Sequence, residues 1–162
     1  VFTATGCGAE LVDYGPALAD DPDYADKARR ISELAQDLAA FLTAEPLAGQ
    51  VRAKETRTAA IHTPCSQYHA LRSPRLVHEI LKDCGSMLSP TRDDHLWCGS
   101  AGSSSILQPA MSGRLRARKL DALTTANPTC IATANVGCQL HLQAEAGVPV
   151  VHWVELVWDA IA

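Results

Sequence analysis

Short apolar runs alternate with longer segments of helical periodicity along this chain of 162 residues. Apolar runs of about four to seven residues that end at Gly, Pro or polar residues are typical of buried strands. Because helical segments separate these runs, the pattern predicts an α/β fold with a mostly parallel sheet flanked by helices. We expect strands at VFTAT (1–5), RTAAIHT (57–63), SML (86–88), TCIATAN (129–135) and VPVV (148–151).

The longest helical pattern covers residues 21–45 and opens with an acidic turn, which suits the helix dipole. Apolar residues recur in it at spacings of three and four: Ala28, Ile31, Ala35, Leu38 and Leu42. A second helix is expected over residues 73–85, with Ser73 as its N-cap and Gly85 as its C-cap.

Three further helical segments follow, over residues 103–127, 138–147 and 152–162. Pro109 and Gly113 are expected to bend or interrupt the first of these. In the closing segment, the favoured interpretation places Trp153 and Trp158 in the core, with partner contact as the alternative.

Cysteines stand where strands are expected to run out into loops or helices. Cys7, Cys65 and Cys138 occupy such positions, and Cys98 precedes two glycines and a helix start. In a parallel α/β sheet the functional loops gather at the carboxyl ends of the strands. We therefore predict that Cys65, Cys98 and Cys138 converge at one edge of the sheet.

A faint internal repeat supports a division of the chain into two parts. FTATGCGAEL near the start and IATANVGCQLHL near the end share the order strand, Gly and Cys, helix. Two generic strand-to-helix turns would give the same match, so both interpretations stay open. If the repeat is real, residues 1–50 are the end of one unit with a connecting helix, and residues 51–162 are a second, complete unit. A chain that opens on Val1, within a strand-like pattern, is then expected to be a fragment or a processed product.

Composition and charge narrow the class of function. A net charge of −4 and a pI near 5.8 argue against a nucleic-acid partner, and no apolar run approaches the roughly 18 residues of a transmembrane helix. The basic segment SGRLRARKL (112–120) is interpreted as a solvated helix face. Six cysteines are too few for a disulfide scaffold, which favours metal binding, redox chemistry or burial. Cys84 and Cys130 are expected to be buried hydrophobes.

The spacing of Cys65, Cys98 and Cys138 resembles the frame of the cysteine-rich CCG domain. Five longer sequence segments resemble the carboxyl-terminal half of glycolate oxidase iron–sulfur subunits. The CCG units of those subunits are similar to those of the heterodisulfide reductase B subunit. The five segments are TATGCGAELVDYG, HLWCGSAGSSSILQP, RKLDAL, IATANVGCQLHL and VHWVEL. The chain departs from the frame at Trp97 and Asn135, which stand where the CCG and CxxC motifs have their first cysteines.

The resemblance implies a metal site. Cys65, Cys98 and Cys138 would be ligands of an iron–sulfur cluster of the 4Fe–4S type, or of zinc as the alternative, and Cys7 would be a ligand in the preceding unit. Gly99 and Gly102 would let the backbone approach the cofactor. Four histidines are the nitrogen candidates for completing the site: His62, His69, His95 and His141.

The resemblance also implies a role and partners. The chain would be a non-catalytic electron-transfer part of a complex that oxidises a 2-hydroxy acid, with flavin-binding subunits as partners. The alternative is a metal-free or zinc-stabilised assembly module that docks the flavin subunits. A cytoplasmic location is expected, with peripheral contact to the inner face of the cytoplasmic membrane through the complex as a further option.

Overall fold

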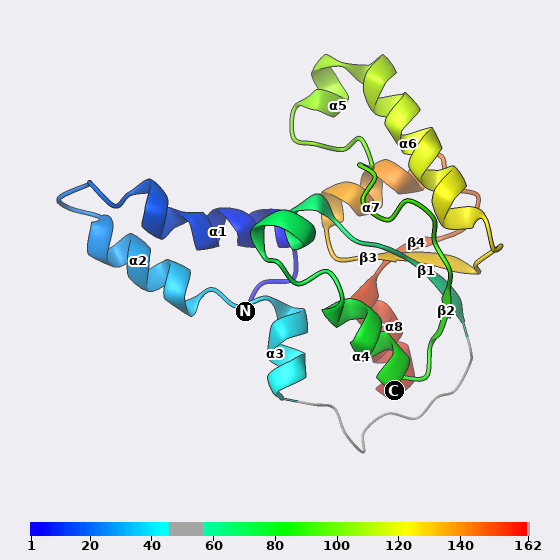
Figure 1. Cartoon of the computed structure of the whole chain (residues 1–162), viewed down its shortest axis with the longest axis horizontal. Helices are drawn as coiled ribbons and strands as arrows, with labels where there is room; N and C mark the ends of the chain where they lie inside the picture. The colour runs from blue at the N-terminus through cyan, green and yellow to red at the C-terminus, as the bar shows by residue number, and fades with distance from the viewer. Residues whose placement is uncertain (46–56, 162) are drawn as a thin grey trace.

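Four parallel strands form the sheet, in the spatial order β2-β1-β3-β4. The structure, a computed structural model, describes residues 1–45 and 57–161 (Figure 1). The predicted α/β fold with a mostly parallel sheet is confirmed, and every strand pair in it is parallel. The strands are β1 (Thr58–His62), β2 (Met87–Ser89), β3 (Cys130–Thr133) and β4 (Val150–His152).

Helices cover both faces of this sheet. Ala59 and Ile61 of β1 point into one core, while Ala60 between them points into the other, as the two-residue period of a strand requires. One face carries α3 (Leu38–Ala44), α4 (Leu76–Asp83) and α8 (Trp153–Ile161). The opposite face carries α6 (Pro109–Thr124) and α7 (Val136–Gln143).

The order in which strands are added to the sheet reverses between β1 and β3. From β1 the chain passes through α4 to the edge strand β2, and from β3 it passes through α7 to the opposite edge strand β4. The carboxyl ends of β1 and β3 therefore form a topological switch point, the place where open α/β sheets bind ligands.

The amino-terminal region differs from the sequence prediction. The expected strand over residues 1–5 is wrong: Phe2 makes a single bridge with Asp37, and α1 (Thr5–Ala17) begins at once. Thr5 donates its amide N–H to the carbonyl of Ala134, so this segment is tied to the end of β3 and does not enter the sheet. α1 packs along α2 (Ala25–Leu34), beside the sheet (Figure 1).

The single helix expected over residues 21–45 is two helices. The break between α2 and α3 lies at residues 35–37, where the backbone of Ala35 and Asp37 is extended. The bridge to Phe2 needs that extended backbone, and this tertiary contact overrides the helical pattern. Ile31, which the pattern placed inward, is 44% exposed.

Other helix signals are confirmed in part. Pro109 interrupts its segment as predicted, separating α5 (Ser104–Leu107) from α6, whereas Gly113 lies inside α6 without a break. Gly85 ends α4 with φ of 79°, as its C-cap role requires. Ser73 is not the N-cap, because α4 begins only at Leu76.

Burial confirms some of the remaining expectations and corrects others. Cys84 and Cys130 are buried in the core, as predicted. Trp153 is also buried, but Trp158 is 65% exposed, so its predicted core packing is wrong. The domain boundary expected between residues 50 and 51 lies outside the described residues.

Candidate metal centre

His62 ends β1 at the switch point of the sheet. Its partner in the strand register is Thr133, the last residue of β3. The Nδ1 atom of His62 lies 3.0 Å from the Thr133 hydroxyl, which fixes the orientation of the ring. The side chain is buried, and Nε2 has no hydrogen-bond partner among the described residues. A buried ring nitrogen without a partner is rare in folded proteins, and an additional group at this place would satisfy it.

The loop from β2 to α5 carries Cys98 to this switch point. Gly99 has φ of +91°, and a Cβ there would lie 2.5 Å from the carbonyl oxygen of Ser112 on α6. Ser112 in turn donates from its hydroxyl to the carbonyl of Gly99 at 2.8 Å. On the other side, the hydroxyl of Ser100 donates to the carbonyl of Gly137, the residue before Cys138, at 3.0 Å. These contacts place the Cys98 sulfur opposite the first turn of α7.

Cys138 is the third residue of α7, which begins two residues before the helical segment expected from the sequence. Asn135, the N-cap residue of this helix, donates from Nδ2 to the Cys138 sulfur at 3.4 Å. Its Oδ1 accepts the amide N–H of Gly6 at 3.3 Å. Asn135 therefore supports the cysteine through a hydrogen bond at a position where the CCG frame has a thiolate.

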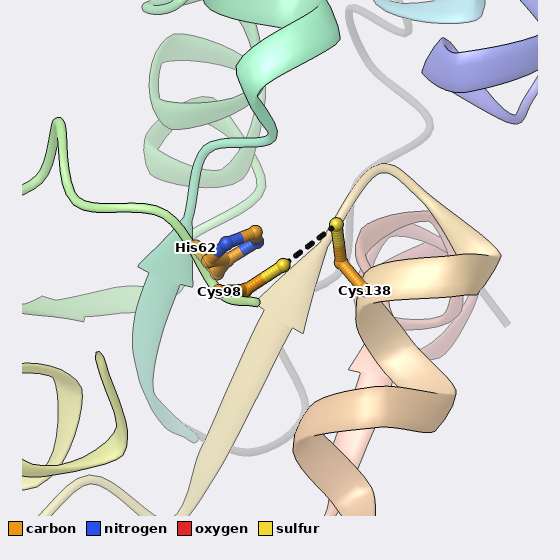
Figure 2. Close-up of side chains that lie close together, drawn as sticks. All are labelled: His62, Cys98 and Cys138. Atoms are coloured by element: carbon orange, nitrogen blue, oxygen red, sulfur yellow. Dashed lines mark hydrogen bonds between the residues drawn. The ribbon is translucent and has the colours of Figure 1, made fainter. Parts of the chain in front are cut away.

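Three donor atoms converge at this place. One ring nitrogen of His62 and the sulfurs of Cys98 and Cys138 lie within 4.8 Å of one another, and all three residues are buried (Figure 2). The two sulfurs are 3.4 Å apart, well beyond the roughly 2.05 Å of a disulfide bond. Imidazole nitrogen and thiolate sulfur are the ligands that zinc and iron take in proteins, so the group is suited to binding a metal.

The two thiols interact strongly. The hydrogen bond with Cys138 lowers the pKa of Cys98 to about 4, against the opposing effect of burial, and the neighbouring His62 ring acts in the same direction as that bond. The same contact raises the pKa of Cys138, because the two sulfurs share one proton and burial disfavours a second charge. Because the thiolate is the form of cysteine that binds metals, the lowered pKa of Cys98 favours the binding of a cation.

The other predicted site residues lie around this group. Cys65 immediately precedes the π-helical turn η1 (Ser66–Ala70), is half-buried and stands outside the three-residue group. Burial raises the pKa of its thiol, and the nearby Cys98 adds to that effect. Cys7 is exposed on the first turn of α1. Gly102 has φ of +50° and open space around it, whereas the space at Gly99 is filled by the protein itself.

Of the four candidate histidines, His62 is the one in the group. His69 and His95 are exposed, and His141 contacts the hydroxyl of Ser112 at 3.2 Å. Trp97, at the first cysteine position of the CCG motif, is 49% exposed.

Lys119 is a buried residue of the site region that the sequence interpretation missed. The segment 112–120 was expected to be a solvated face, but the Lys119 side chain is fully buried. Its ammonium group donates to the carbonyl of Asp94 at 2.9 Å, in the loop that leads to Cys98. Burial lowers the pKa of Lys119, while Asp94 and the thiols of Cys98 and Cys65 oppose that effect. The same interaction favours the ionised form of these two thiols.

Comparison with known proteins identifies the family. The model of the cysteine-rich domain family named CCG matches residues 59–143. This span contains β1 from its second residue onward, β2, β3 and all three residues of the metal group. The chain belongs to this family. The predicted resemblance to CCG domains is thereby confirmed.

The similarity to individual known proteins extends beyond the residues that the CCG family model matches. The chain is 42% identical over 159 residues to the glycolate oxidase iron–sulfur subunit of Escherichia coli K12, covering 98% of this chain and 39% of that protein. It is 25% identical to the probable glycolate oxidase iron–sulfur subunit of Bacillus subtilis 168, covering 99% of this chain and 38% of that protein. It is 24% identical to lactate utilization protein A of Shouchella clausii, covering 88% of this chain and 60% of that protein. The chain thus spans about two fifths of the two glycolate oxidase relatives.

Among the described residues, no helix is both long enough and apolar enough to cross a membrane.

Proposed function

We propose that this chain is the CCG-domain part of an iron–sulfur subunit in a complex that oxidises a 2-hydroxy acid. The complete subunit relays electrons from flavin-binding subunits to an acceptor, and the chain itself performs no step on the substrate. The observation that carries the proposal is the 42% identity to a glycolate oxidase iron–sulfur subunit over 98% of the chain. Similarity that continues through α1, the sheet and α8 supports a shared role and not only a shared fold.

The cofactor of the complete subunit is an iron–sulfur cluster of the 4Fe–4S type, which accepts and releases single electrons. Such clusters are held by four cysteine thiolates. In this chain the CCG frame supplies Cys65, Cys98 and Cys138, while Trp97 and Asn135 occupy the two other cysteine positions. The frame therefore does not complete a four-cysteine set. We assign the 4Fe–4S cluster to the complete subunit, and we assign no electron-transfer step to this edge of the sheet.

The proposed partners are the flavin-binding subunits of the same complex. The names of the relatives, glycolate oxidase iron–sulfur subunit and lactate utilization protein A, support a complex acting on small 2-hydroxy acids. The proposal places this complex in the cytoplasm, with peripheral contact to the inner face of the cytoplasmic membrane.

The test uses the complete subunit, purified without oxygen together with its flavoprotein partners. We expect iron and labile sulfide in the complex, and an EPR signal of a reduced cluster after addition of glycolate or lactate. A complex that contains flavin but neither iron nor labile sulfide would overturn the proposal. A cluster that neither 2-hydroxy acid reduces would overturn it as well.

A docking module is the second candidate function, and the replacement of two frame cysteines by Trp97 and Asn135 favours it. In that case the CCG domain joins the flavin subunits to the rest of the subunit and carries no electrons. Removal of the residues corresponding to 59–143 would then abolish assembly but leave the iron and sulfide content of the subunit unchanged. Loss of iron and sulfide in that deletion would exclude the docking role.

A further inference from the structure

We propose that His62, Cys98 and Cys138 bind a single divalent metal ion of the zinc class, through Nε2 and the two sulfurs. This assignment goes beyond the proposed electron relay and does not depend on it, because it concerns the chemistry of this chain's own residues. It also adds His62, which is no part of the cysteine frame, to the ligands.

The convergence of the donors indicates one ion and not a cluster. In a four-iron cluster held by four cysteines, each iron takes one protein ligand and its other bonds go to sulfide. Here three protein donors lie within 4.8 Å of one another. Three donors around one point fill three positions of a tetrahedral ion and leave one position open, which is too few for an iron that shares several sulfides.

The distance between the sulfurs agrees with this assignment. Two thiolates bound to one tetrahedral zinc ion, each at about 2.3 Å, lie about 3.8 Å apart. The sulfurs of Cys98 and Cys138 are 3.4 Å apart, so they need to separate by only a few tenths of an ångström. The hydrogen bonds of Ser100 with Gly137 and of Ser112 with Gly99 hold the backbone next to each of these cysteines.

His62 has the environment of a metal ligand. A ligating histidine usually offers one ring nitrogen to the metal while a polar group holds the other, which fixes the orientation of the ring. The Thr133 hydroxyl holds Nδ1 at 3.0 Å, and Nε2 is buried without a partner among residues 1–45 and 57–161. An unpartnered ring nitrogen in the core costs free energy unless a ligand occupies it, and a metal ion beside the two sulfurs removes that cost.

The balance of charge also favours a divalent ion. Cys98 and Cys138 lie in an apolar cluster with Ala60, Leu120 and Ile131, where an uncompensated pair of thiolates would be costly. A divalent cation bound by two thiolates and a neutral imidazole forms a group without net charge. The metal therefore allows both cysteines to be ionised in a buried position.

The experiment titrates the complete 162-residue chain with Co²⁺ and Zn²⁺, after removal of metals and under anaerobic, reducing conditions. We expect one Co²⁺ per chain, with the absorption of thiolate-to-cobalt charge transfer and of a tetrahedral cobalt site, and its displacement by one Zn²⁺. Zn²⁺ should also raise the unfolding temperature of the chain, because it binds the folded form. This experiment involves neither iron nor flavin. A chain that binds no Co²⁺ would therefore overturn the metal-site proposal without bearing on the electron relay.

Three variants and two controls locate the ion. Cys98→Ser, Cys138→Ser and His62→Gln should each weaken Co²⁺ binding by more than about 100-fold, since loss of a ligand exceeds the effect of losing a supporting group. The two cysteine variants should lose about half of the charge-transfer absorption, and His62→Gln should retain it at saturating Co²⁺. Cys7→Ser and His69→Asn, at exposed positions outside the group, should bind as the unmodified chain does.

Circular dichroism and urea unfolding of each metal-free variant show whether it folds, and the three ligand variants test the site independently of one another. Absence of Co²⁺ binding by the folded, reduced chain would overturn the proposal. So would unchanged binding in His62→Gln, or the incorporation of iron with labile sulfide at Cys98 and Cys138.

Discussion

The buried ammonium group of Lys119 donates a hydrogen bond to the main-chain carbonyl oxygen of Asp94, 2.9 Å away. A second carbonyl, that of Asp93, lies at 3.4 Å. Lys119 is on α6 and the two carbonyls are on the loop that runs to Cys98, so this lysine ties the loop to the helix layer. The charge of Lys119 also interacts with the thiols of Cys98 and Cys65 and favours their ionised form.

Replacement of Lys119 by Met should loosen this loop. The main-chain carbonyls of Asp93 and Asp94 would lose a partly buried donor, so we expect the free energy of unfolding to fall by about 1–3 kcal/mol in urea titrations. Cys98 should also react faster with a thiol reagent in the folded chain, since the loop that buries it is no longer held. Arg118→Met is the matched control: Arg118 is exposed one residue earlier on α6, and its loss should change stability by no more than about 0.5 kcal/mol. Equal labelling rates of Cys98 in both variants would contradict the role given to Lys119.

Removal of the Thr133 hydroxyl should weaken metal binding without touching a ligand. Thr133→Val keeps the shape of the side chain but leaves Nδ1 of His62 without a partner. We expect the affinity for Co²⁺ to fall about 10–100-fold and the metal-free chain to lose about 1–3 kcal/mol of stability. Thr133→Ser, which keeps the hydroxyl, should bind nearly as tightly as the unmodified chain. If the valine and serine variants bind equally, the hydroxyl does not orient the ring.

The order of strands and helices could be predicted from sequence because each buried strand is short, apolar and bounded by turn residues. β1 and β3 match the predicted segments to within two residues at each end. The errors fall where a contact distant in sequence decides the local structure. The Phe2 bridge to Asp37 both removes the first expected strand and divides the long helix, and nothing in the local pattern reveals it.

The location of the site could be predicted from the sequence, but the residues that form it could not. The carboxyl ends of parallel strands do bring Cys98 and Cys138 together, as the fold class implies. The choice of His62 among four histidines, and the position of Cys65 outside the group, depend on side-chain directions that only the packed structure fixes. A signal for His62 did exist in the sequence, since it directly follows the apolar run 59–61 at the end of the expected strand.

Gly99→Ala should be strongly destabilising. The backbone there has φ of +91°, and the added Cβ would lie 2.5 Å from the carbonyl oxygen of Ser112. Strain and overlap together should cost more than about 2 kcal/mol in urea unfolding. Gly102→Ala in the same loop is the control, because Gly102 has φ of +50° with open space around it and should lose only about 1 kcal/mol. Equal losses in the two variants would show that the approach of Ser112 does not constrain this loop.

The stability of the chain should depend on pH through His78 on α4. Burial lowers the pKa of this histidine below its usual 6.5, and the charge of Asp94 only partly opposes that effect. As the pH falls through 6.5, the unfolded chain therefore binds a proton at this residue before the folded chain does, and the unfolded state is favoured. We expect the free energy of unfolding to fall between pH 7 and pH 5 more steeply in the unmodified chain than in His78→Asn, as measured by urea titration at each pH. His69→Asn, at an exposed position, should give the same slope as the unmodified chain, and parallel curves for all three proteins would show that His78 does not contribute.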